Sequence, residues 1–162
     1  MLAEELERLG ASCELAIVGG AAVVLLYGAR DATKDIDAVV LSANSSDGVR
    51  EAITRSAQRL GLPDDWLNDA AKGYVHGLTL GERVFEANSL VVNALAPQQL
   101  LAMKLCAWRD DLDIEDARLL MSKLVGGRDE VWHSVEHHLL PGRETKAYFA
   151  FCDLWESERG LQ

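Results

Sequence analysis

The feature that most limits the fold is a short apolar run that stops at two adjacent glycines. Residues 15–18 are all apolar, and Gly19 and Gly20 follow directly. This pattern is typical of a buried strand that turns sharply, because glycine accepts backbone conformations that other residues avoid. Residues 21–27 then predict a helix, and Gly28 lies where that helix is expected to end. The chain therefore contains a predicted strand–turn–helix unit near its start.

Strand and helix patterns continue to alternate along the chain. Residues 35–41 predict a second strand, and three stretches between residues 78 and 94 predict further strands of the same sheet. Residues 63–81 predict a short helix and a loop. Apolar periodicity predicts helices at residues 2–9, 98–108, 113–124, 130–139 and 144–158. A further helix is expected to begin at one of the capping candidates, residues 44–46, and to end at Pro63. We expect an α+β (α/β-like) fold with a small mixed β-sheet flanked by helices. It forms one domain, residues 1–162, with a sheet-containing core, 1–96, and a helical part, 97–162.

Composition and charge exclude several classes of protein. The 16 Lys and Arg against 26 Asp and Glu give a net charge of −10, which argues against a surface that neutralises many nucleic-acid phosphates. The uncharged apolar run at residues 15–29 is shorter than the roughly 20 residues that cross a bilayer. Residues 1–10 lack the basic start of a secretory signal, so we expect a cytoplasmic protein without a membrane span. Cys13, Cys106 and Cys152 form no Cys-x-x-Cys pair and predict buried, reduced thiols.

Two aspartates open the predicted second strand. Side chains alternate along a strand, so Asp35 and Asp37 are expected to share one side while Ile36 points into the core. Two carboxylates together with substrate phosphates are a ligand set that suits Mg²⁺. Gly19 and Gly20 let the backbone approach a phosphate closely, and the helix start presents N–H groups to it. A basic residue before the pair, at position 30 or 34, can neutralise the remaining charge.

These residues resemble the signature of the nucleotidyltransferase superfamily, whose fold is related to DNA polymerase beta. The resemblance rests on Gly19-Gly20-Ala21-Ala22, Arg30 and Thr33-Lys34-Asp35-Ile36-Asp37. The closer likeness is to a small bacterial branch with abortive-infection (AbiEii-type) toxins and minimal nucleotidyltransferases, and the spacing is also similar to that of aminoglycoside and lincosamide nucleotidyltransferases. The resemblance implies that the glycines, with Arg30, Thr33 and Lys34, contact a nucleoside triphosphate. It also implies that Asp35 and Asp37 bind Mg²⁺.

A second element of the resemblance lies in the helical part. Residues 97–105 and 109–116 are similar to the Leu-x-x-Lys-Leu and Asp-x-x-Asp elements of the toxin-like branch. Lys104 shares a helix face with apolar residues, and an enclosed lysine needs an anionic partner. Asp113 and Asp116 can face one direction on the next helix. We expect Lys104 to act in catalysis by contacting either the triphosphate or this aspartate pair, and we assign Asp113 and Asp116 to nucleotide binding.

The family usually has a third carboxylate on an adjacent strand, where it activates the attacking hydroxyl. Glu82 and Glu86 are the nearby candidates, and the sequence leaves their register open. With such an acid, the chemistry is in-line attack of an acceptor hydroxyl on the α-phosphate, with Mg²⁺ stabilising the departing pyrophosphate.

Several functions stay open on this evidence. The preferred one is a Mg²⁺-dependent nucleotidyltransferase that transfers a nucleoside monophosphate to an acceptor. The toxin-like branch implies a tRNA or protein acceptor and a cognate antitoxin, whereas the antibiotic-modifying branch implies a small alcohol. The net charge of −10 disfavours a large RNA footprint. The alternative, from a different class, is a degenerate member that binds nucleotide or a partner protein without catalysis.

His133 and His137 are separated by four residues, a spacing at which two imidazoles can hold a metal ion. No acidic third ligand is in evident register. We interpret both as solvated or packing histidines.

Overall fold

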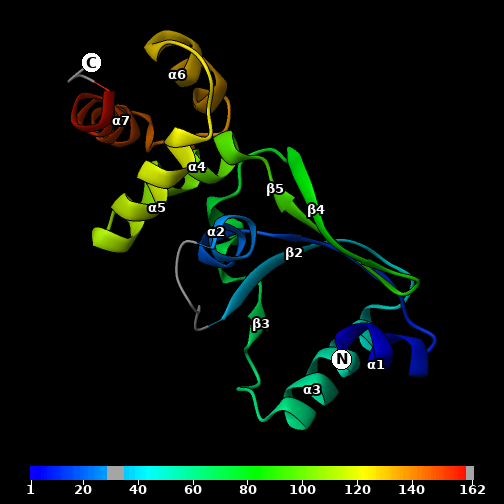
Figure 1. The fold of residues 1–162 in the computed structure, drawn as a ribbon. Helices are drawn as coiled ribbons and strands as arrows, with labels where there is room; N and C mark the ends of the chain where they lie inside the picture. Colours follow the sequence, from blue (N-terminus) through cyan, green and yellow to red (C-terminus); the bar gives the residue numbers. More distant parts are fainter. Residues whose placement is uncertain (29–34, 160–162) are drawn as a thin grey trace. The chain divides into compact units, whose positions relative to one another are not determined.

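The computed structural model describes residues 1–28 and 35–159 (Figure 1). These residues divide into two compact units, which we call the sheet unit (Met1–Lys72 and Leu80–Ala94) and the helical unit (Gly73–Thr79 and Leu95–Gln162). The elements in chain order are α1 (Leu2–Arg8), β1 (Cys13–Ile17), α2 (Gly19–Tyr27), β2 (Ile36–Ala43), α3 (Ser46–Leu60), β3 (Leu67–Asn68), the 3-10 helix η1 (Ala70–Tyr74), β4 (Leu80–Ala87), β5 (Leu90–Leu95), α4 (Pro97–Ala107), α5 (Asp111–Ser122), α6 (Arg128–Glu136) and α7 (Glu144–Arg159).

The sheet has the strand order β3-β2-β1-β5-β4. β1 pairs antiparallel with β2 and parallel with β5, and β2 pairs parallel with β3. This is the small mixed sheet expected from the sequence, so the predicted α+β class is confirmed. The chain crosses between the two units after Lys72, Thr79 and Ala94, and the expected single domain with parts 1–96 and 97–162 stays a prediction.

α1 and α3 pack against each other and against one face of the sheet (Figure 1). Ser45 begins α3 as expected, because its Oγ accepts the N–H of Gly48 at 3.1 Å. Glu5 is buried in α1 and pairs with Arg8 at 2.8 Å and with Arg59 of α3. The buried core of this face consists of Leu6, Ala11, Cys13, Leu15, Val49, Ala52 and Leu90.

The structure differs from the sequence prediction between residues 63 and 87. Leu67–Asn68 forms a strand where only a short helix and a loop were expected, and β4 is continuous from Leu80 to Ala87. A strand of two residues is too short to show a side-chain period, so its pattern cannot be read locally. The three cysteines are free, as expected, although Cys152 is half-buried rather than buried.

α4 is the central element of the helical unit and contacts α5, α6 and α7. All of its residues from position 99 to 107 are buried. Gln99 holds the segment Gly73–Thr79 in this unit: its Nε2 donates to the carbonyls of His76 (3.2 Å) and Gly77 (2.9 Å), and its Oε1 accepts the N–H of Thr79 (2.7 Å). Among the described helices, none combines the length and apolar character needed to cross a bilayer.

A buried charge network joins α4 to α5. The Nζ of Lys104 lies 2.9 Å from Oδ1 of Asp113 and 2.8 Å from Oδ2 of Asp116. Arg109 donates to Oδ2 of Asp113 through its side chain at 3.0 Å and its backbone N–H at 3.1 Å. Burial raises the pKa of Asp113, but the hydrogen bonds from Arg109 and Lys104 outweigh burial and lower that pKa to about 2. The network therefore stabilises the helix pair only while every partner is present and charged.

Replacing Lys104 tests this dependence. We expect Lys104→Met to lower the free energy of unfolding by about 3–5 kcal/mol, since it leaves two buried carboxylates without their shared cation. The matched control is Lys72→Met, which removes an exposed ion pair with Asp69 and is expected to cost less than about 1 kcal/mol. Urea denaturation followed by circular dichroism measures both. Equal losses in the two variants would contradict the structural role of the network.

Acid should weaken the same network in a defined pH window. The pKa of Asp113 lies at about 2 in the folded protein, below its ordinary value of 3.8, so its contribution is present above pH 3.8 and lost as the pH falls toward 2. We expect Asp113→Asn to flatten the decline of stability across this window, measured by urea denaturation at several pH values. Asp47→Asn, at an exposed acid on α3, should keep the slope of the unmodified protein. If Asp113→Asn loses stability with falling pH as steeply as the unmodified protein, this prediction is contradicted.

Candidate active site at the start of β2

A further backbone hydrogen bond extends the pairing of β1 with β2 beyond the end of β1. The N–H of Val18 donates to the carbonyl of Asp37 at 2.9 Å, directly beyond the antiparallel pair Ile17 and Ala38. α2 begins at the next residue, Gly19, so the pairing brings the first turn of this helix beside Asp37. The apolar run and the glycines therefore place the helix N-terminus at the acidic end of β2.

Gly19 and Asp37 lie in close contact. Gly19 has a φ of +61°, and a Cβ atom at this position would stand 3.5 Å from Oδ2 of Asp37. A left-handed φ is strained for any residue with a side chain, so glycine is favoured here for its conformation, while the Cβ itself would be in ordinary van der Waals contact with Asp37. Val18 caps the helix without a side-chain hydrogen bond. The N-terminal N–H groups of α2, the positive end of its dipole, are thus next to a carboxylate and suited to a further anion.

Both predicted acids contact one short segment, residues 68–71. Oδ2 of Asp35 accepts from Nδ2 of Asn68 at 3.4 Å, and Oδ1 of Asp37 accepts the backbone N–H of Ala71 at 3.3 Å. Ile36, between them, lines an apolar hollow of the sheet with Ile17 and other aliphatic side chains. The alternation along this strand is as expected from the sequence. Asp35 is exposed and Asp37 half-buried, so the pair can be reached by an ion from solvent.

The donor set at this site suits Mg²⁺. Two carboxylates contact the same segment, and the glycine beside them leaves the space that a side chain would fill. Such oxygen ligands, completed by water and substrate phosphates, meet the preference of Mg²⁺ for hard donors. The remaining predicted phosphate ligands, Arg30, Thr33 and Lys34, lie outside the described residues.

Glu82 and Glu86, the candidates for a third carboxylate, lie on β4. In the strand order, β1 and β5 separate β4 from β2, which puts their backbones roughly 14 Å apart at about 4.8 Å per strand. Glu86 pairs with Arg83 at 2.8 Å. The position opposite Asp37 on the neighbouring strand β3 is instead occupied by Asn68.

Asn68 is a site residue that sequence reasoning missed. Its Oδ1 accepts the N–H of Ala70 at 2.8 Å and its Nδ2 also donates to the carbonyl of Asp65 at 3.2 Å, so it shapes the turn that carries Ala71 to Asp37. The only signal in the sequence is an Asn-Asp pair after two apolar residues in an acidic stretch. That signal does not show which strand pairs with β3.

Lys104, Asp113 and Asp116 all lie in the helical unit. Of the two contacts expected for Lys104, the structure has the one with the aspartate pair. Its contact with a triphosphate, and the nucleotide-binding role of the two aspartates, stay predictions.

Comparison with known families agrees with the geometry. Residues 1–129 match the model of a family described as nucleotidyltransferase of unknown function (DUF6036). The match covers the Gly19-Gly20 turn, the Asp35/Asp37 pair and Lys104, and it does not single out the toxin-like branch. No curated protein matches the chain significantly. Because the matched residues make up most of the chain and include both elements of the signature, the chain belongs to this nucleotidyltransferase family.

Proposed function

We propose that the protein transfers a nucleoside monophosphate from a nucleoside triphosphate to an acceptor hydroxyl, with Mg²⁺ bound at the start of β2. One observation carries the proposal: the carboxylate of Asp37 lies beside Gly19 at the N-terminus of α2. Asp35 and Asp37 also both contact the segment of residues 68–71. This arrangement supports a cation site beside an anion site. A metal-bound triphosphate requires both.

The residues have separable roles in this proposal. Asp35 and Asp37 hold Mg²⁺, which when bound neutralises phosphate charge and stabilises the departing pyrophosphate. Gly19 and Gly20 bind phosphate oxygens through the N–H groups at the start of α2. Asn68 and the N–H of Ala71 orient the two carboxylates, so that these need not reorganise when the nucleotide arrives.

The second part of the proposal concerns the chemical class of the acceptor. The protein carries a net charge of −10, which favours a small alcohol or a protein side chain over a large RNA, because RNA binding requires many phosphates to be neutralised. A toxin with a cognate antitoxin and an antibiotic-modifying enzyme both fit this chemistry. Incubation with each labelled nucleoside triphosphate and Mg²⁺, with label followed onto tRNA, protein and aminoglycoside or lincosamide acceptors, separates them.

A second candidate function is nucleotide binding without transfer. It is favoured by Asn68, because an amide stands opposite Asp37 on the adjacent strand and cannot accept a proton from an attacking hydroxyl. Nucleotide binding without pyrophosphate release in the incubation above would support this candidate.

Removing the charge of the acidic pair tests the metal site. We expect Asp35→Asn and Asp37→Asn each to weaken Mg²⁺-dependent nucleotide binding by about a hundredfold or more, since even indirect support of a metal site is worth 10–100-fold. Isothermal titration calorimetry with each nucleoside triphosphate and Mg²⁺ measures the affinity. Asp47→Asn, an exposed acid on α3, is the matched control and should bind as the unmodified protein does. Unchanged binding in both site variants would remove the metal assignment.

Gly19 allows a second test, of the phosphate site. We expect Gly19→Ala to weaken nucleotide binding by about tenfold or more, equivalent to about 1.4 kcal/mol, since its methyl group would occupy the approach between α2 and Asp37. Gly61→Ala is a close control, because Gly61 has a similar φ of +65° and open space around it. Both variants should lose roughly 1–2 kcal/mol of stability from backbone strain. Equal nucleotide affinity in the two variants would argue against phosphate binding at Gly19.

A further inference from the structure

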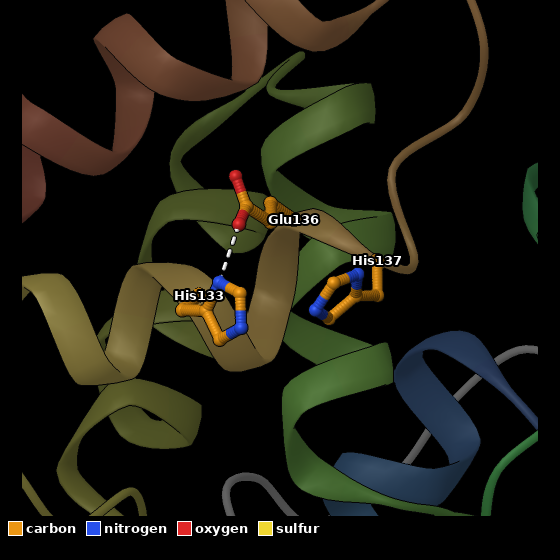
Figure 2. A group of neighbouring side chains, drawn as sticks. All are labelled: His133, Glu136 and His137. Atoms are coloured by element: carbon orange, nitrogen blue, oxygen red, sulfur yellow. Dashed lines mark hydrogen bonds and ion pairs between the residues drawn. The ribbon is translucent and has the colours of Figure 1, made fainter.

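Three potential metal ligands meet at the C-terminal end of α6. His133, Glu136 and His137 each offer one ligand atom, and these atoms all lie within 4.8 Å of one another. Figure 2 shows the three side chains together, with Nδ1 of His133 hydrogen-bonded to Oε1 of Glu136 at 2.7 Å. The expectation that no acidic ligand accompanies the histidines is wrong, because residues three and four apart share one face of a helix and Glu136 therefore joins them.

The spacing of these groups is close to that of a coordination shell. Two ligand atoms bound to one zinc ion at 2.0–2.1 Å are about 3.3 Å apart in tetrahedral geometry. The His133–Glu136 contact is slightly shorter than this, and the two imidazole rings have their centroids 4.7 Å apart at an interplanar angle of 78°. Small rotamer adjustments of exposed side chains can therefore bring all three groups onto one ion.

The electrostatic surroundings also favour a cation. His133 and Glu136 lie in the last turn of α6 and His137 is its C-cap, so all three are near the carbonyl groups that carry the negative end of the helix dipole. Glu136 adds a full negative charge. All three residues are exposed, so an ion enters without displacing packed side chains, and its remaining coordination positions face water.

We propose that His133, Glu136 and His137 bind one divalent transition-metal ion, for which Zn²⁺ is the best fit. Two imidazoles and one carboxylate are a common zinc ligand set, whereas Mg²⁺ prefers oxygen ligands alone. The three residues follow the stretch that matches the family, residues 1–129, and lie in the helical unit. The proposal is therefore independent of the nucleotide site on β2.

Zinc titration tests the proposal directly. The protein with Asp35→Asn and Asp37→Asn is titrated with Zn²⁺ in a calorimeter, so that the acidic pair on β2 does not compete. We expect one equivalent to bind. Adding His133→Ala or His137→Ala should weaken binding by about tenfold or more, since a direct ligand contributes at least as much as an indirect one. Glu136→Gln should weaken it to a smaller extent, because the amide oxygen is neutral. Millimolar Mg²⁺ should not displace the bound zinc.

The controls separate this site from unspecific binding. His76→Ala removes an exposed histidine outside the trio and should leave zinc affinity unchanged. Circular dichroism should show the same helix content in all variants, because His133 and Glu136 are exposed. Co²⁺ in place of Zn²⁺ gives a visible absorption band that reports nitrogen ligands, and His133→Ala should reduce it. Failure to bind one equivalent, or binding that persists in both His133→Ala and His137→Ala, would overturn the proposal.

Discussion

The sheet unit depends on the antiparallel pairing of β1 with β2, which the backbone hydrogen bond from Val18 to Asp37 extends beyond Ile17 and Ala38. This pairing fixes where β1 ends relative to β2, so the helix that follows β1 starts beside the acidic end of β2. Glycine at position 19 favours the arrangement, since the backbone there has a left-handed φ that is strained for residues with a side chain. The positive end of the α2 dipole in turn stabilises the negative charge of Asp37. The nucleotide chemistry proposed for this protein rests on that short contact.

The two acidic pairs of the family signature, Asp35/Asp37 and Asp113/Asp116, differ in their exposure to solvent. Asp35 and Asp37 are at least partly accessible to solvent, so a cation can reach them. Asp113 and Asp116 are buried and already bonded to Lys104, with Arg109 adding a second positive charge at Asp113. Because these carboxylates are buried and paired with basic side chains, the network acts first on stability. Residues of one chemical type thus form the proposed metal site in one unit and a buried ion-pair network in the other.

Ligand chemistry, more than charge, distinguishes the two candidate metal sites. The acids of β2 offer only oxygen atoms, which suit Mg²⁺ and phosphate-bound metal, whereas the α6 site adds two imidazole nitrogens. A protein with a net charge of −10 attracts cations in general, so charge alone does not select between them. Selection follows from which donor atoms the local backbone brings together. At the start of β2 the period of two brings Asp35 and Asp37 to one side, and at the C-terminal end of α6 the spacing of three and four brings the two histidines and Glu136 together.

The sequence alone determined the features that depend on neighbouring residues. It predicted the strand before Gly19, the helix to Gly28, the alternation of Asp35 and Asp37, the Ser45 cap and the helices of the C-terminal half, because periodicity and turn chemistry act over a few positions. Only the tertiary structure showed that the two-residue strand β3 places Asn68 opposite Asp37, and that Gln99 draws Gly73–Thr79 into the helical unit. These contacts join residues that lie 20 or more positions apart. Their partners are chosen by packing and backbone hydrogen bonding across the fold, which no local pattern encodes.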